Sequence, residues 1–250
     1  MIRLKTLAEI EAIARSGAVL AGLFAALPQQ IRPGTTTADL DRFAEEFIRS
    51  HPGAEPAFKG LYGFPANICT SVNHEVVHGI PSRRCVLKEG DIISVDVGVK
   101  LDGWYADAAV TYAVGEIDEE ARRLLTVTEE ALRLGIAQAV VGNRLGDIGS
   151  AIQRHAEAAG YSVVRDLVGH GIGRAPHEEP QVPNFGRPGR GLRLQPGLVL
   201  AIEPMVNEGT AEVRTLPDRW TVVTADRKRS AHFEHTVAVL ESGPRILTAL

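Results

Sequence analysis

The sequence predicts one α+β domain over residues 1–250, built from two similar halves around a shared, mainly antiparallel sheet. The patterns follow the order helix, helix, strands, and this order occurs twice along the chain. In addition, residues 90–96 (GDIISVD) match residues 197–203 (GLVLAIE), so each half places a carboxylate six residues after a glycine. This repeat is weak by itself, because glycine before an apolar strand is common, and the repeated order of elements strengthens it.

The composition narrows the class of protein. The 250 residues can bury a substantial core, and a net charge of −4 with scattered basic residues gives no nucleic-acid footprint. The chain has only two cysteines, Cys69 and Cys85, which argues against a disulfide framework. The first residues lack a signal-peptide core, and no apolar run approaches the roughly 18 residues that cross a bilayer. We therefore expect a soluble cytoplasmic protein without a membrane partner.

The first half is expected to begin with two helices. Residues 6–9 (TLAE) have the form of a capping box and open a helix that runs to about Leu27. A second helix is expected to start near Thr37 as its N-cap, after the break at 33–34. Residues 51–66, rich in proline, glycine and aromatics, are expected to form a loop. The residues expected to face the core are Ile10, Ile13, Val19, Leu20, Leu23, Leu40, Phe43, Phe47 and Ile48.

Strands dominate the rest of the chain, apart from one more pair of helices. A short strand is expected over 68–72, and a hairpin over 91–99 and 106–114, around the turn signal Asp102-Gly103. The second half is expected to contain helices at 119–140 and 147–159 and strands at 163–168, 198–206, 221–224 and 235–240.

The hairpin carries a pair of aspartates. A register centred between Leu101 and Asp102 would place Asp96 directly opposite Asp107, within the slack that a bulged hairpin loop allows. A single aspartate in a strand is better explained as a solvated strand end or turn residue. Two facing carboxylates among apolar neighbours would repel each other unless a cation lies between them. The pair therefore favours a metal site.

Three further residues are candidate ligands. His170 lies in a glycine-rich loop at 169–173, Glu203 ends an apolar strand, and Glu234 opens the last strand. Each of them alone is explained equally well as a surface residue. With the two aspartates they make four carboxylates and one imidazole, which is about what two divalent ions with shared carboxylates would need. His177 lies beyond helical chelating spacing from His170, so it is free to act on a substrate.

Several motifs occur together in one order. They are residues 73–81 (NHEVVHGIP), 96–98 (DVG) with 106–107 (AD), 169–174 (GHGIGR), 177–180 (HEEP), 202–204 (IEP) and 230–236 (SAHFEHT). With them the chain resembles, over nearly its whole length, the type I methionine aminopeptidases of the pita-bread superfamily, which also contains prolidase and aminopeptidase P. Prolidases and aminopeptidases P carry an additional N-terminal domain and type II enzymes an insertion, and 250 residues leave room for neither.

The resemblance implies a pita-bread fold and one catalytic metallopeptidase domain. Its function would be to remove the initiator methionine from nascent proteins and peptides, favouring small second residues, with two divalent ions as cofactors. Asp96 would chelate one ion, Asp107 and Glu234 would bridge both, and His170 and Glu203 would complete the other. Glu203 would also accept a proton from the bridging water. Cobalt, manganese, iron and zinc all suit such a ligand set.

The resemblance also implies the substrate contacts. His78 would lie near the scissile amide nitrogen, and His177 would polarise the carbonyl or stabilise the tetrahedral intermediate. The residues expected to line the methionine pocket are Tyr62, Phe64, Cys69 and Trp220. Because water is the nucleophile, Cys69 is interpreted as pocket wall. The partner would be the N-terminal methionine of nascent chains, a role compatible with work near the ribosome, and we expect a monomer.

Three positions depart from the family pattern. Gly98 stands where many relatives have threonine, Pro176 precedes the second substrate histidine, and Phe64 takes a place often held by tyrosine. These changes affect the shape of the pocket and leave the metal ligands in place. Three alternatives stay open: a peptidase of the same fold that cleaves X-Pro bonds, a catalytically dead binding protein, and a metal-free creatinase-like hydrolase. The presence of all five ligands disfavours the last two.

Overall fold

The computed structural model describes residues 2–249, so Met1 and Leu250 of the predicted domain lie outside the described part. The first half contains α1 (Leu7–Ala26), η1 (Leu27–Gln29), α2 (Thr37–Arg49), β1 (Ala54–Pro56), η2 (Leu61–Gly63), β2 (Cys69–Val72), β3 (Glu75–Val77), β4 (Ile92–Leu101) and β5 (Trp104–Ala113). The second contains α3 (Glu119–Ala137), α4 (Leu145–Ala158), β6 (Ser162–Val163), β7 (Gly169–Gly171), β8 (Glu178–Val182), β9 (Val199–Ile202), β10 (Met205–Asn207), β11 (Val213–Thr215), β12 (Val222–Thr224), β13 (Ser230–His232), β14 (Glu234–Leu240) and β15 (Gly243–Ile246).

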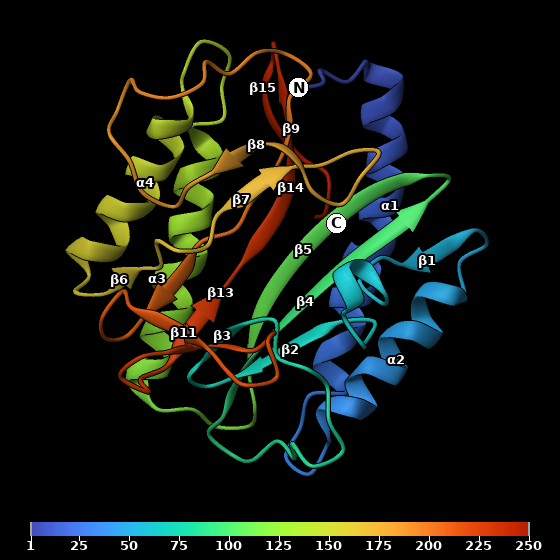
Figure 1. Cartoon of the computed structure of the whole chain (residues 1–250), viewed down its shortest axis with the longest axis vertical. Helices are drawn as coiled ribbons and strands as arrows, with labels where there is room; N and C mark the ends of the chain where they lie inside the picture. Colours follow the sequence, from blue (N-terminus) through green and yellow to red (C-terminus); the bar gives the residue numbers. More distant parts are fainter. Residues whose placement is uncertain (1, 250) are drawn as a thin grey trace.

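The main sheet joins the two halves. Its strands follow the order β1-β4-β5-β14-β9-β7-β8, with β2 added on β4 and β15 on β14, and each of these pairings is antiparallel. Figure 1 shows α1 and α2 beside the β4–β5 hairpin, and α3 and α4 beside β14 and β9. The predicted α+β fold with two helix-helix-strand halves around a shared antiparallel sheet is confirmed.

Each helix pair has its own hydrophobic core. One cluster packs α1 and α2 mainly against β4 and β5, and a second packs α3 and α4 mainly against β9 and β14. Along β4, Val95 and Val97 are buried in the first cluster, whereas Asp96 between them points to the opposite face. The helices therefore cover one face of the sheet and leave the other face for polar side chains.

The first two helices begin where capping chemistry places them. Thr6 and Glu9 form the predicted capping box of α1. The N-cap of α2 is Thr36 rather than Thr37, because the Thr36 hydroxyl accepts the Asp39 N–H while Asp39 reaches back to the Thr36 N–H. Thr37 is instead the first residue of the helix and is buried.

The expectation about apolar runs was wrong for the first helix. Among the described residues, one helical segment, Leu7–Gln29, is long and apolar enough to span a membrane by length and composition. Ile13, Leu20 and Leu23 in α1 are nevertheless fully buried against the sheet. A helix whose apolar face packs in this way is the core helix of a globular fold.

The predicted register of the aspartate hairpin was also wrong. Asp96 pairs with Ala109, and Asp107 pairs with Gly98, so the two aspartates are diagonal neighbours rather than directly opposite. The reason is the turn, in which Asp102 and Gly103 both have positive φ and connect Leu101 directly to Trp104. Such a two-residue loop fixes the ladder without a bulge. Residues two apart share a face, so both carboxylates still point the same way.

The second half departs further from the expected strands. The strand expected over 163–168 is limited to Ser162–Val163, and His170 lies in β7 rather than in a loop. Glycines flank it because β7 is tightly packed: a Cβ on Gly169 would lie 2.3 Å from the Ala201 carbonyl oxygen, and one on Gly171 would lie 2.3 Å from that of Glu179.

Other boundaries differ in smaller ways. The strand expected over 198–206 is divided at Glu203-Pro204, because proline has no N–H to continue the ladder. The segment 51–66, expected as loop, contains β1 and η2. At the positions of β3, β8, β11, β13 and β15, the sequence analysis had predicted no strand.

Candidate metal centre and active site

A cavity of about 550 Å³ opens on the face of the sheet that the helices leave free. All five candidate ligands line it, and they come from both halves: Asp96 from β4, Asp107 from β5, His170 from β7, Glu203 directly after β9, and Glu234 from β14. The antiparallel order β4-β5-β14-β9-β7 places these five strands side by side. Residues far apart in the sequence therefore meet in one cavity.

The five side chains form two overlapping groups. In one group, ligand atoms of Asp96, Asp107 and Glu234 lie within 4.8 Å of one another, and in the second, those of His170, Glu203 and Glu234 do. Glu234 belongs to both, and His170 Nε2 also lies 4.0 Å from Asp107 Oδ2. This arrangement has the form expected for two neighbouring cations that share carboxylates.

The four carboxylates are buried close to one another, so they need a positive charge nearby if they are to be ionised together. Burial, together with the neighbouring acids, raises the pKa of Asp96 and Glu234, and burial with the charge of Asp107 raises that of Glu203. Burial likewise raises the pKa of Asp107. Within residues 2–249, one oxygen each of Asp96, Asp107 and Glu234 is buried without a hydrogen-bond partner. Buried oxygens of this kind fit divalent cations.

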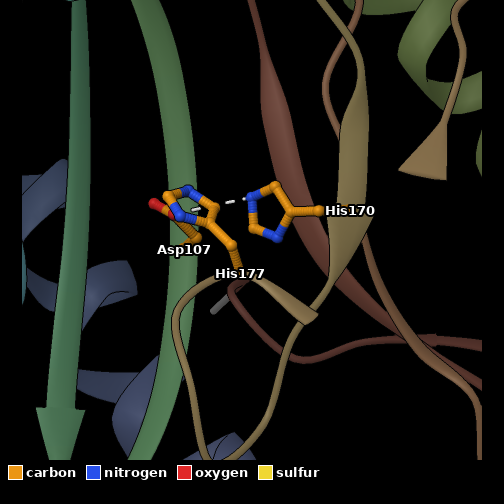
Figure 2. Close-up of side chains that lie close together, drawn as sticks. All are labelled: Asp107, His170 and His177. Atoms are coloured by element: carbon orange, nitrogen blue, oxygen red, sulfur yellow. Dashed lines mark ion pairs between the residues drawn. The ribbon is translucent and has the colours of Figure 1, made fainter. Parts of the chain in front are cut away.

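The tautomer of His170 also fits a ligand. Its Nδ1 lies 2.9 Å from the Gly171 carbonyl oxygen, which can only accept a hydrogen bond, so Nδ1 carries the proton. The Nε2 lone pair therefore faces the acids, 3.6 Å from Glu203 Oε1. Burial, and next the electrostatic influence of the neighbouring His177 ring, lower the pKa of His170 to about 4, so the imidazole is neutral as a ligand must be. Figure 2 shows His170 and Asp107 facing each other.

His177 and His78 lie beside the acids. The His177 ring lies nearly perpendicular to that of His170, with ring centroids 4.5 Å apart, at the end of the turn that leads into β8 (Figure 2). His177 also stacks on Tyr62, whose hydroxyl lies 3.4 Å from His177 Nδ1. Burial lowers the pKa of both His177 and His78. His78 has a φ of 59°, a left-handed conformation of the kind found at functional sites.

The residues expected to form the methionine pocket line the cavity in two different ways. Phe64 and Trp220 meet edge to face at 5.1 Å and form an apolar wall with Cys69. Burial, followed by the charge of Asp96, raises the pKa of the Cys69 thiol, so this cysteine is poorly suited to be a nucleophile. Tyr62 is instead 75% exposed and lies at the mouth, against His177.

Phe58, to which no sequence pattern pointed, completes the pocket and explains one departure from the family pattern. Phe58 packs in the same apolar cluster and lines the cavity. A Cβ on Gly98 would lie 2.7 Å from its ring. Because Gly98 has no side chain, the Phe58 ring can occupy the space that a side chain there would take.

His232 is a fourth imidazole near the acids, and sequence reasoning did not single it out, although it lies in the SAHFEHT motif. It is 1% exposed, and its Nε2 lies 3.7 Å from Glu203 Oε2. In the described part of the chain neither of its ring nitrogens has a hydrogen-bond partner. Burial, and next the electrostatic influence of the His78 ring, lower the pKa of His232 to about 3, so the ring is neutral.

Two threonines hold the seam between the halves. The main-chain ladder of β5 and β14 has two residue pairs, Glu234 with Ala109 and His235 with Ala108. At one end the Thr236 hydroxyl accepts the Asp107 N–H at 2.9 Å and donates to the Asp107 carbonyl at 2.8 Å. At the other end the Thr111 hydroxyl makes the same two contacts with His232, at 2.9 and 2.7 Å. The backbone of Asp107 is thus fixed from the opposite half.

Comparisons with known proteins agree with this geometry. The model of metallopeptidase family M24 matches residues 11–241. The methionine aminopeptidase of Clostridium perfringens is 58% identical over 250 residues, which cover 100% of both chains. Methionine aminopeptidase 1 of Bacillus subtilis is 52% identical over 99% of both chains. The crystal structure of methionine aminopeptidase from Thermotoga maritima superposes with a TM-score of 0.98 at 48% identity, covering 100% of both chains.

Proposed function

Because the chain belongs to metallopeptidase family M24, and within it to the type I methionine aminopeptidases, we propose that it removes the initiator methionine from nascent proteins and peptides with small second residues. The observation that carries this proposal is the convergence of five ligands from both halves on one cavity. An apolar wall beside those ligands supplies a pocket for an unbranched thioether side chain.

The donor set fits two divalent ions. Asp96, Asp107 and Glu234 would hold one, and His170 and Glu203, with Asp107 and Glu234 shared, would hold the other. When bound, such ions supply an activated water as nucleophile near neutral pH. Cobalt, manganese, iron and zinc are all compatible with these donors, and metal supply selects among them.

The chain's own groups would move the proton and orient the substrate. Glu203 lines the cavity directly after β9, so its carboxylate would accept a proton from the attacking water and pass it to the departing amine. His177 is neutral and can donate a hydrogen bond to the substrate carbonyl, where negative charge develops. His78 also lines the cavity and would contact the scissile amide nitrogen.

The deciding experiment combines metal analysis with a choice of peptides. The purified protein is assayed for bound metals and for hydrolysis of Met-Ala-Ser, Met-Leu-Ser and Gly-Pro peptides. We expect about two divalent ions per chain at saturation, with Met-Ala-Ser cleaved fastest. Cleavage of the Gly-Pro peptide alone would instead establish an X-Pro peptidase. Metal binding without cleavage of any peptide would indicate a binding protein.

We propose the cytoplasm as the site of action, with the protein acting as a monomer near the ribosome. Two free thiols, Cys69 and Cys85, support a reducing compartment. Sedimentation of the purified protein tests the monomer, and co-sedimentation with ribosomes carrying short nascent chains tests the proximity.

A further inference from the structure

Lys5 links the N-terminal segment to the surroundings of the active site. Its side chain is 1% exposed, and its Nζ donates to Glu178 Oε2 at 2.7 Å. Its main-chain N–H donates to the Gly197 carbonyl at 2.7 Å, and the next residue, Thr6, caps α1. The backbone of Lys5 is therefore fixed on both sides, and its ammonium group has a defined position.

Glu178 uses its two oxygens for different tasks. Oε2 accepts from Lys5, while Oε1 accepts the N–H groups of Arg174 at 2.7 Å and Ala175 at 3.2 Å. Burial raises the pKa of the Glu178 carboxyl, but the hydrogen bond and charge of Lys5 and the two N–H groups outweigh burial and hold it below its ordinary value. The carboxylate thus remains charged and keeps the turn over residues 173–177 in place.

That turn ends at His177. On its other side the Gly173 carbonyl accepts the Tyr105 N–H at 2.9 Å, so the start of the turn is tied to β5. A Cβ on Gly173 would lie 2.6 Å from Lys5 Cε and 3.0 Å from Glu178 Oε1. The glycine therefore leaves the space in which the ion pair lies, and the pair and the turn form one packed unit.

We propose that Lys5 is a positioning residue for catalysis, which holds His177 beside His170 through Glu178 and the turn. This inference rests on the role proposed above for His177. Without the ammonium group, the Glu178 carboxylate would lose its partner in a mostly buried position and turn toward water. The N–H groups of Arg174 and Ala175 would then lose their acceptor, and His177 would lose its fixed place.

The test compares Lys5→Met with a matched control. Methionine keeps the length and apolar volume of the lysine stem but removes the charge. We expect kcat on Met-Ala-Ser to fall about ten- to a hundredfold, as expected for a misplaced catalytic group, while metal content stays unchanged. Arg3→Met is the control, because it removes a positive charge from the same N-terminal segment, while Arg3 pairs with Glu9 rather than Glu178 and otherwise lies over the Trp104 ring. This control should keep kcat within about twofold of the parent protein, the scatter of a surface substitution.

A double-variant cycle separates positioning from general loss of stability. If Lys5 acts through His177, Lys5→Met will cause no further loss of kcat in a His177→Ala background. Lys5→Arg, which keeps the charge and donors, should restore most of the activity. Should Lys5→Met fail to fold, Glu178→Gln enters the same cycle, because the amide keeps an acceptor for the turn but attracts Lys5 more weakly.

The outcomes distinguish the two proposals. Unchanged kcat in Lys5→Met, or a loss that adds fully to that of His177→Ala, overturns the positioning role and leaves the proposed function intact. An active His177→Ala protein with parental kcat would overturn the role of His177 itself. A loss of kcat that disappears in the His177→Ala background establishes the positioning role.

Discussion

The two halves present their ligands by different means. In the first half, Asp96 and Asp107 lie on one continuous hairpin whose strands, β4 and β5, are ten residues each. In the second half, His170 and Glu203 lie in or after strands of three and four residues, with breaks close to the ligand. The first half also supplies Phe64 and Cys69 of the apolar wall, whereas the second half supplies Trp220 and His177.

This difference shows two ways to fix a side chain. Along the hairpin, a regular ladder sets the separation of the aspartates, so each one depends on many equivalent hydrogen bonds. In the second half, Glu234 opens the seven-residue strand β14, whereas His170 and Glu203 depend on a few individual contacts, such as the Gly171 carbonyl for His170. We therefore expect substitutions around the second-half ligands to alter geometry more readily than those around the hairpin.

Asp107→Ala is the strongest way to break this arrangement, because Asp107 lies close to ligands of both halves. We expect activity on Met-Ala-Ser and binding of divalent metal to be lost together, measured by assay and metal analysis. A protein that kept full activity after chelation and this substitution would contradict the two-ion site.

His177→Ala should lower kcat by about 10²–10³ while metal content stays unchanged, because the imidazole would stabilise charge on the substrate carbonyl rather than hold an ion. Steady-state kinetics and metal analysis of the same preparation check this. Loss of metal along with kcat would move His177 into the ligand set.

Removal of metal should make stability depend on pH. Asp96, Asp107, Glu203 and Glu234 have folded-state pKa values above their ordinary values, and for Asp107 the value is about 7. A raised carboxyl pKa contributes stability that is present below the unfolded pKa and is lost as pH rises through the folded pKa. The Tm of the chelated protein should therefore decrease as the pH rises from about 4 to 7. Melting curves recorded across this pH range, with and without metal, measure this dependence. A Tm that did not change with pH in the metal-free protein would contradict repulsion among the four carboxylates.

Substitution of the two seam threonines should have the smallest effect, and the two variants can be compared directly with each other. Thr236→Val and Thr111→Val each remove a buried hydroxyl that bonds to a main-chain N–H and C=O, so each should lose about 1–3 kcal/mol of unfolding free energy. Only Thr236→Val should also weaken metal binding, because Thr236 holds Asp107 whereas Thr111 holds His232. Denaturant unfolding and metal titration of both variants check this, and equal metal affinities would remove the distinction.

Sequence patterns predicted the first half better than the second, for a physical reason. Capping, a two-residue turn and regular alternation are local, so α1 and the β4–β5 hairpin could be predicted directly. Even there, the register needed the knowledge that Asp102 and Gly103 both take positive φ. The strand around His170 could not be predicted locally, because its glycines are required by close contacts with Ala201 and Glu179 in other parts of the sheet.

The same division applies to the site. The four candidate carboxylate ligands were found because carboxylates in or beside apolar strands conflict with local expectation, and His170 was found from its glycine-rich segment. The family motifs added His78 and His177. Phe58, His232 and Lys5 were not found, because each is of a residue type that is ordinary at its position in the sequence. Phe58 lies in a loop, His232 inside a motif, and Lys5 near the N-terminus. Their importance lies in distant contacts: Gly98 under Phe58, Glu203 beside His232, and Glu178 beside Lys5.

The ladder between β5 and β14 is short, so the contact between the two halves depends on additional interactions such as bound ions. Glu234 lies at this seam, opposite Ala109, and also in both ligand groups. Ions held by residues of both halves would therefore add their binding free energy to the cohesion of the halves. Under metal starvation the seam would open more often, and proteases would gain access there first.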